Sequence, residues 1–124
     1  MKIPWRVGPP RVLAFIRGPK EKTVEVSAVL DTGSYIVLIK PKVAKFLGYD
    51  LEKAQETILY SVSGMFNARK LVLEEVSVGD CEAKNVDAVC FELPSARIGA
   101  LLGLNWINRF RITFDKGNEE ILIE

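Results

Sequence analysis

The sequence predicts an all-β, barrel-like domain with one or two short helices, and three observations support this fold class. Short runs rich in β-branched and aromatic residues recur along the chain, and several alternate apolar and polar residues with period two. Clusters of Gly, Pro, Asn and Asp separate these runs. Only one segment has clear start and stop signals for a helix. A length of 124 residues suits one compact core, so we expect a single domain over residues 1–124.

The first half of the chain predicts a hairpin, a strand and a helix. Residues 12–16 and 23–29 read as paired strands around a turn at 18–21, and the second strand leads directly into Asp31. Residues 35–39 are again apolar and β-branched. The helix has Pro41 in its first turn, an apolar stripe through residues 43–47, and Gly48 as its stop.

The second half predicts two hairpins and a short helical piece. Residues 57–62 and 71–78 flank a small polar segment at 61–67, which indicates a long hairpin with an exposed tip. A turn at Gly79 leads to a strand region at 83–93, and residues 99–103 open a helical piece that continues through Trp106 to Phe110. A final hairpin joins 111–115 to 120–123. In the first half a strand region enters an apolar-apolar-Asp-Thr-Gly turn and a helix, and in the second half a strand region enters Leu101-Leu102-Gly103 and a short helix. This weak repeat fits internal two-fold pseudosymmetry.

Composition excludes several classes of function. Seventeen basic and sixteen acidic residues give a net charge of +1, so nothing favours binding to nucleic acid or to an anionic membrane. The chain has no His, which removes Ser-His-Asp and Cys-His catalysis in their usual forms and the commonest zinc ligand. We therefore expect no metal and no cofactor. Cys81 and Cys90 could form a disulfide, but two free thiols is the favoured interpretation.

The ends of the chain carry opposite charges and no targeting signal. No apolar run approaches the roughly 18 residues of a spanning helix, and the start lacks the pattern of a signal peptide. We expect a soluble, cytoplasmic protein. Basic residues precede any acid at the N-terminal end, and Glu119, Glu120 and Glu124 crowd the other end. Two solvated termini is the simpler interpretation, and the alternative is that the opposite termini meet, including across a subunit boundary.

Asp31 is the candidate catalytic residue. It follows an apolar strand, where a carboxylate is costly unless it accepts hydrogen bonds. Gly33 lets the backbone turn and offers its N–H, while Thr32 and Ser34 offer hydroxyls. For an isolated Asp-x-Gly, an ordinary Asx turn that closes a hairpin would be the better explanation.

The order of motifs changes that balance. Two apolar residues, then Asp31-Thr32-Gly33-Ser34, an apolar strand, a Pro-started helix, a flap-like hairpin and a later Leu101-Leu102-Gly103 follow one another. This order resembles the retropepsin-like aspartic peptidases over roughly residues 23–115, and it is closer to cellular, bacterial or archaeal members than to retroviral ones. The resemblance implies a closed or partly open acid-protease barrel with a flap hairpin.

The resemblance also implies roles for particular residues. Asp31 matches the catalytic aspartate, and Thr32, Gly33 and Ser34 match the loop that supports it. Leu101, Leu102 and Gly103 match the segment that packs behind this loop. The flap that closes over substrate matches Tyr60, Val62, Ser63, Gly64, Met65 and Phe66. Retroviral members carry an Asp and an Arg where this chain has Tyr35 and Leu104, so a dimer would be braced differently.

The length of the chain predicts that the active form is a homodimer. Hydrolysis by two carboxylates needs one ionised and one protonated group, and a close pair titrates as a unit. The chain supplies one Asp-Thr-Gly, so the second carboxylate is expected from Asp31 of a twin subunit across a two-fold axis. An extended peptide would bind between flap and floor by β-addition, with Ile36, Val62, Met65 and Phe66 as candidate pocket walls. The alternatives are a catalytically inactive dimerisation or peptide-binding domain and a barrel without any site.

Overall fold

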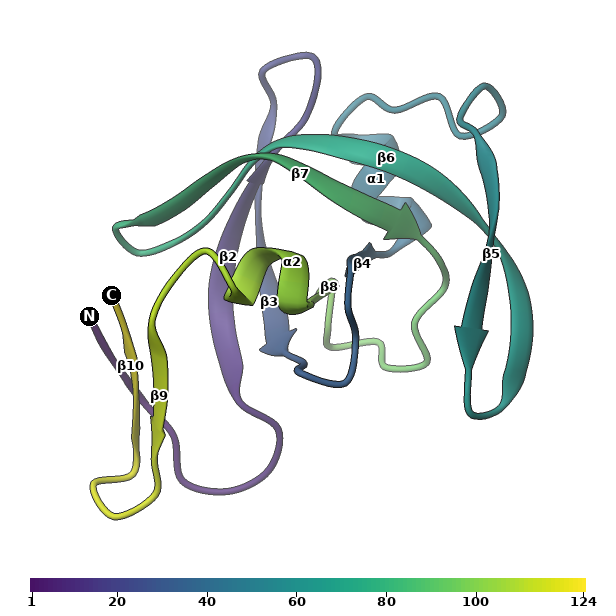
Figure 1. The fold of residues 1–124 in the computed structure, drawn as a ribbon. Coiled ribbons are helices and arrows are strands. Elements are labelled where there is room, and N and C mark those ends of the chain that lie inside the picture. The colour runs from purple at the N-terminus through teal and green to yellow at the C-terminus, as the bar shows by residue number, and fades with distance from the viewer.

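A computed structural model describes residues 1–124, and it contains ten strands and two short helices (Figure 1). The elements in chain order are β1 (Lys2–Pro4), β2 (Arg11–Arg17), β3 (Thr23–Leu30), β4 (Val37–Ile39), α1 (Pro41–Phe46), β5 (Glu56–Ser61), β6 (Gly64–Val78), β7 (Cys81–Cys90), β8 (Ala100–Leu102), α2 (Leu104–Ile107), β9 (Ile112–Asp115) and β10 (Glu120–Ile123). The all-β prediction is confirmed. Neither helix has the length and apolar character needed to cross a membrane.

Six strands close into a barrel. The larger sheet has the order β2-β3-β8-β4-β7-β6-β5, and an additional pairing of β2 with β6 joins its two sides. Closure satisfies the edges of these strands, so only β5 remains at a free edge of this sheet. The barrel interior holds one main cluster of apolar side chains, and Trp106, Ile16 and Leu73 are among its fully buried members. Trp106 therefore lies in the core.

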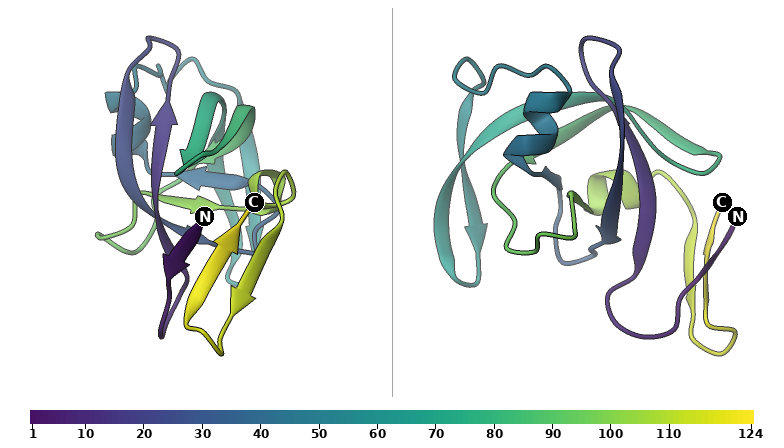
Figure 2. Two further views of the ribbon diagram at one scale, coloured as in Figure 1. Left: turned by 90° about the vertical axis from the view of Figure 1, so that its left-hand side faces the viewer. Right: turned by 180° about the vertical axis from the view of Figure 1, so that it is seen from behind.

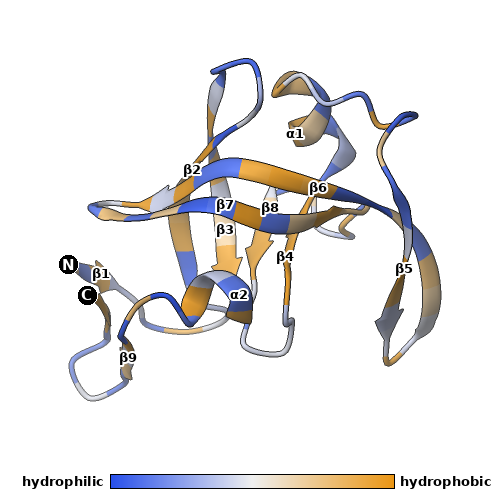
Figure 3. Cartoon of the chain, turned by 45° about the horizontal axis from the view of Figure 1, so that its top comes forward, coloured by the Kyte–Doolittle hydropathy of each residue, from blue (hydrophilic) through white to orange (hydrophobic).

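β8 lies between β3 and β4 and separates these two consecutive strands. It pairs in parallel with β3, with Leu30 opposite Leu102, and antiparallel with β4, with Leu38 opposite Leu101. All three strands are short or mostly buried, and Figure 3 shows hydrophobic residues concentrated on them. The loop that joins β3 to β4, which contains Asp31, must therefore pass over the end of β8.

Two expected elements differ in the structure. Residues 100–102 form a strand, and the helix begins only at Leu104, so the helical piece predicted from residue 99 was wrong at its start. A three-residue apolar run has no periodicity that distinguishes strand from helix, and the pairing with β3 and β4 decides it. The flap hairpin was predicted, but its tip is shorter than expected because β6 already begins at Gly64.

The two chain ends form a separate three-stranded sheet. β1 pairs with β10, and β10 pairs with β9, all antiparallel. Figure 2 shows the termini side by side in both views. The opposite termini thus meet within one chain, and Arg6 Nε lies 3.2 Å from Glu119 Oε2. This is the alternative that the charge pattern had left open, and it replaces the simpler interpretation of two solvated termini.

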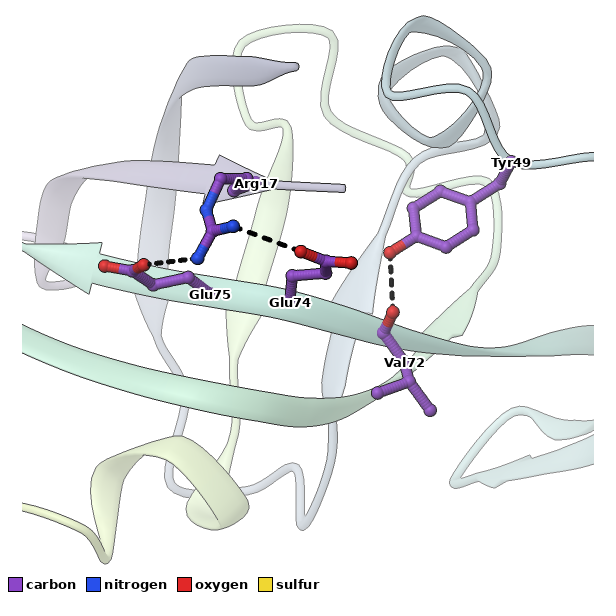
Figure 4. Close-up of polar contacts among 5 residues, drawn as sticks. All are labelled: Arg17, Tyr49, Val72, Glu74 and Glu75. Carbon is purple, nitrogen blue, oxygen red and sulfur yellow. Dashed lines mark hydrogen bonds and ion pairs between the residues drawn. The ribbon is translucent and has the colours of Figure 1, made fainter. Parts of the chain in front are cut away.

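Polar contacts connect the outside of the barrel to β6 (Figure 4). Arg17 on β2 donates to Glu74 at 3.1 Å and to Glu75 at 2.9 Å. The hydroxyl of Tyr49, just after α1, donates to the carbonyl of Val72 at 2.6 Å. Burial raises the pKa of Tyr49 to about 12, and the hydrogen bond from Arg17 holds the pKa of Glu75 below its usual range. Each contact joins segments that are far apart in the sequence.

Candidate active site

Asp31 occupies the first position after β3, where the backbone leaves the barrel wall. Its N–H donates to the carbonyl of Leu102 at 2.9 Å, which continues the β3–β8 ladder by one bond. The N–H of Gly33 donates to Asp31 Oδ1 at 2.9 Å, and the N–H of Ser34 donates to the Asp31 carbonyl at 3.2 Å. The expected bond from Gly33 is therefore present. The side chain of Asp31 is only partly buried, however, and not enclosed as its place after an apolar strand had suggested.

The turn at Asp31 has Asx geometry, yet it does not close a hairpin. The carboxylate accepts from the N–H two residues ahead, which is the Asx pattern. The strands on either side are not paired with each other, because β8 separates them. An ordinary hairpin turn thus does not account for this loop. The Ser34 hydroxyl donates to the Ile36 carbonyl at 2.7 Å and so stabilises the exit of the loop, not the carboxylate.

The segment after β8 fixes the far side of the same loop. The N–H of Leu104 donates to the Ser34 carbonyl at 2.8 Å, and the N–H of Asn105 donates to the Tyr35 carbonyl at 3.1 Å. Gly103 makes this approach possible, since a Cβ built there would lie 2.5 Å from the Ile36 carbonyl oxygen. Real Cβ atoms do not come that close to backbone oxygen, so only glycine fits without a shift of the loop. The pairing of Leu101 and Leu102 with β3 and β4 and the close approach at Gly103 therefore bring this segment against the Asp31 loop.

Asn105 has a structural role that the sequence analysis did not assign. Its Oδ1 accepts from the N–H of Val37 at 3.0 Å, and its Nδ2 donates to the carbonyl of Asp87 at 2.7 Å. The one side chain thus connects the start of β4 to β7. In the sequence, only the position of Asn105 directly after Gly103-Leu104 could have indicated this role. Its hydrogen-bond partners, Val37 and Asp87, lie 68 and 18 residues away along the chain.

The flap hairpin is formed by β5 and β6. Its register pairs Tyr60 with Met65 and Ser61 with Gly64, which leaves Val62 and Ser63 as a two-residue turn. Gly64 has a φ of +131°, a value that side-chain-bearing residues rarely adopt. The Ser61 hydroxyl lies 3.0 Å from that of Ser63 and accepts from the Ser63 N–H at 3.2 Å. These bonds define the turn geometry within the tip itself.

A groove of about 560 Å³ separates the Asp31 loop from the flap. We call it the Asp31 groove, and its lining consists of Asp31, Gly33, Ser34, Tyr35, Leu38, Leu59, Tyr60, Ser61 and Val62. Asp31 is the only carboxylate among them. The groove thus brings together the candidate catalytic residue and the inner side of the flap.

The expected site residues divide between this groove and its surroundings. Asp31, Gly33, Ser34, Tyr60 and Val62 line the groove. Thr32 is exposed on the loop beside it, and Ser63, Gly64 and Met65 are exposed on the flap. Phe66 packs on Phe91 with ring centroids 5.3 Å apart, and Ile36 lines a different cavity, next to Leu71. Four lining residues were not among the expected site residues, namely Tyr35, Leu38, Leu59 and Ser61.

Comparison with known proteins agrees with this geometry. The family model described as aspartyl protease matches residues 16–106, which include the Asp31 loop, the flap and the Leu101-Leu102-Gly103 segment. The chain belongs to the aspartyl protease family. A search of curated proteins found no significant match.

A solved structure places this member of the aspartyl protease family in its retropepsin-like branch. The crystal structure of a retropepsin-like aspartic protease from Rickettsia conorii is 26% identical in sequence and superposes with a TM-score of 0.75. The match covers 99% of this chain and 90% of the Rickettsia chain. The fold and the family inferred from the motif order are therefore confirmed, and the match to a bacterial protein agrees with the departures from the retroviral pattern at Tyr35 and Leu104.

The chain contains no cluster of side chains that resembles a metal site. No three His, Cys, Asp or Glu side chains come together. Cys81 and Cys90 are buried and unpaired, and burial raises the pKa of the Cys90 thiol to about 11. A neutral, enclosed thiol is a poor nucleophile and a poor ligand. Neither cysteine lines the Asp31 groove.

Proposed function

We propose that this aspartyl protease is an endopeptidase that works as a homodimer, with Asp31 of each subunit forming one catalytic pair. The observation that carries the proposal is the composition of the Asp31 groove. Its lining includes one carboxylate, held at the loop by the Gly33 N–H and open to a space of about 560 Å³. General acid–base hydrolysis of an amide by carboxylates needs two, and a second copy of the same chain is the available source.

Two facing Asp31 carboxylates would divide the chemistry between them. Carboxylates about 3 Å apart cannot both ionise, so one proton is shared by the pair. The ionised member accepts a proton from water, and that water attacks the peptide carbonyl carbon. The protonated member donates to the carbonyl oxygen. Collapse of the tetrahedral intermediate breaks the C–N bond as a proton moves to the leaving nitrogen, and the products are a carboxylic acid and an amine.

The flap provides a surface for an extended substrate. β5 pairs only with β6, so its other edge keeps free N–H and C=O groups. An extended peptide can add to such an edge through main-chain bonds, while its side chains enter alternate pockets. Tyr60, Leu59 and Leu38 in the groove would contact these side chains. The proposed unit is the single domain of residues 1–124, and the two unpaired cysteines favour a reducing compartment such as the cytoplasm.

The role of Asp31 is tested by Asp31→Asn, with Asp80→Asn as the matched control. Asp80 lies in the exposed turn between β6 and β7, so its substitution changes the same charge away from the groove. We expect peptide cleavage at mildly acidic pH to fall by at least about 100-fold in Asp31→Asn and to stay unchanged in Asp80→Asn. Both variants should keep the circular dichroism spectrum of the native protein. Equal loss in both variants, or unchanged cleavage by Asp31→Asn, contradicts the proposal.

Mixing experiments test whether the site is shared. When wild type and Asp31→Asn subunits exchange freely at equal amounts, only about a quarter of the dimers contain two intact aspartates. Cleavage should then fall to about a quarter of that of an all-wild-type sample at the same total concentration. Independent active sites would instead retain about half. If the wild type binds peptides but cleaves none of a broad library, the alternative of an inactive peptide-binding domain is the better description.

A further inference from the structure

The turn between β2 and β3 packs on the end of α1. A Cβ built at Gly48, just after the helix, would lie 2.8 Å from Cδ of Lys20 in this turn. Lys22, from the same turn, places its Nζ 5.6 Å from the centroid of the Phe46 ring. The turn and the helix end therefore form one continuous surface, although they come from different parts of the chain.

One face of α1 adds two more lysines to this surface. Lys45 and Phe46 follow Lys42 by three and four residues, so the three side chains leave the helix on the same side. The opposite side, with Ala44 and Leu47, is buried. All four lysines are exposed, and Phe46 is 53% exposed. We call this surface the lysine patch, and its members are Lys20, Lys22, Lys42, Lys45 and Phe46.

The charges of the lysine patch are not neutralised within the chain. The cations that form ion pairs all lie elsewhere, and they are Arg6, Arg17, Lys53 and Arg69. Helix α1 contains no acid, and Glu21 is the one carboxylate on the turn. Four lysines and one glutamate give this surface a charge of +3. The net charge of +1 conceals the cluster, because it sums over the whole chain.

The shape and composition of the patch indicate the chemistry of its partner. No residue of the patch lines the Asp31 groove or the other main cavities, so the surface offers no groove for a peptide or a helix. It contains no Arg, whose planar fork binds individual phosphate groups through paired hydrogen bonds. Lysines are point charges on flexible apolar stems. Several lysines around an exposed aromatic ring are typical of proteins that bind the surface of an anionic bilayer.

We propose that the lysine patch binds the surface of an anionic phospholipid bilayer, with the Phe46 ring at the level of the headgroups. The negative surface potential of such a bilayer raises the partition coefficient by about fivefold for each nearby lysine. A surface charge of +3 therefore gives roughly a hundredfold. One ring alone inserts only weakly, so binding is peripheral and reversible, and it falls as salt screens the charges.

The position of the patch leaves the Asp31 groove open to water. The β2–β3 turn and α1 lie in the upper part of Figure 1, and the Asp31 loop and the flap turn lie along its lower edge. Strand β3 connects the two ends, and its eight residues span roughly 25 Å. A bilayer at the patch thus holds the protein by the end opposite to Asp31. Binding to lipid is independent of the proposed peptidase activity.

Vesicle flotation with the full chain tests the proposal. Phosphatidylcholine vesicles with about 30% phosphatidylserine should bind the protein at least tenfold more strongly than pure phosphatidylcholine at about 0.05 M salt. This binding should fall by at least tenfold at about 0.5 M salt. Equal binding to both kinds of vesicle, or binding to neither, overturns the proposal. Asp31→Asn should bind vesicles as the wild type does, so lipid binding and peptide cleavage are tested separately.

A double variant locates the binding surface. Lys42→Gln/Lys45→Gln removes two charges from the patch, and Lys70→Gln/Lys84→Gln removes two charges from other exposed positions. The patch variant should lose at least about tenfold in partition to anionic vesicles, and the control less than about threefold. None of these lysines forms an ion pair, so both variants should keep nearly the urea midpoint of the wild type. Equal losses would show that net charge and not the patch causes binding, which overturns the proposal.

Phe46→Trp tests the orientation on the bilayer. After subtraction of the wild-type signal from Trp5 and Trp106, the new indole should emit at shorter wavelength when anionic vesicles are added, because it leaves water. Tyr35→Trp, on the Asp31 loop, is the matched control and should not respond. A blue shift at Tyr35 without one at Phe46 overturns the proposal. So does binding to a short RNA at about 0.1 M salt without binding to anionic vesicles, which would make the patch a nucleic-acid surface.

Discussion

Gly103→Ala should destabilise the protein strongly, because the new methyl carbon meets only backbone atoms. The built Cβ lies 2.5 Å from the Ile36 carbonyl oxygen, 2.7 Å from the Ile36 carbonyl carbon and 2.7 Å from the Ser34 carbonyl oxygen. Side-chain rotation cannot relieve these contacts, so the Asp31 loop must move away from β8. Overpacking of this kind costs about 1–3 kcal/mol.

Movement of the loop also weakens two hydrogen bonds. The bonds from Leu104 to Ser34 at 2.8 Å and from Asn105 to Tyr35 at 3.1 Å connect the same two segments. Each contributes about 1 kcal/mol, so the total loss is roughly 3–5 kcal/mol. Domains have total stabilities of about 5–15 kcal/mol, and this single methyl group would remove a large part of that.

Urea unfolding followed by tryptophan fluorescence measures the effect, since Trp106 is fully buried. Gly117→Ala is the matched control, because its Cβ would meet nothing nearer than Asp115 Oδ1 at 3.5 Å. We expect the control to remain within about 0.5 kcal/mol of wild type. A Gly103→Ala protein within about 1 kcal/mol of wild type would refute the argument that backbone contact requires glycine at this position. Unchanged cleavage by the folded variant would refute the claim that Gly103 positions the Asp31 loop.

Four other outcomes follow from particular contacts. Asn105→Ala removes the two side-chain hydrogen bonds by which Asn105 connects β4 to β7. The free energy of unfolding, measured by urea titration, should fall by about 1–3 kcal/mol. In conditions where the variant remains folded, kcat should fall as well. The raised pKa of Tyr49 means that the unfolded chain loses this proton first, so stability falls between pH 10 and about pH 12. Tyr49→Phe should reduce that fall in melting temperature, and it should also lower the melting temperature at neutral pH because the bond to Val72 is lost. The thiol of Cys90, with its pKa near 11, should react with a thiol reagent at pH 8 about 100-fold more slowly in native than in denatured Cys81→Ser protein. The hydrogen bond to Arg17 lowers the pKa of its partner Glu75. The pair therefore stabilises the fold above the unfolded-state pKa of Glu, and this stabilisation is lost as the pH falls. Arg17→Gln should lower the melting temperature more at pH 7 than at pH 3.

Local pattern predicted the elements whose signals are short-range. The β2–β3 hairpin was identified from alternation around the turn at Gly18, and α1 from Pro41 and Gly48, whose φ of +98° suits a helix end. Asp31 was found the same way, because a carboxylate after an apolar strand is costly and Gly33 offers a nearby donor. These inferences needed only residues within one turn or one strand of each other. The order of these motifs along the chain was then enough to identify the family.

Tertiary structure decided everything that depends on distant pairing. The sequence does not show that β8 lies between β3 and β4, because the pairing of distant strands produces no periodic pattern in the residues nearby. For the same reason it does not show that the side chain of Asn105 bonds to Val37, which lies 68 residues away. The accessibility of Asp31 was also decided there. A position after a buried strand suggested enclosure, but the loop passes over the end of β8 and opens to the groove. The termini meet in one chain because β10 pairs with β1 along one edge and with β9 along the other. The opposite charges at the two ends did not predict this pairing, since charged side chains are also stable in solvent.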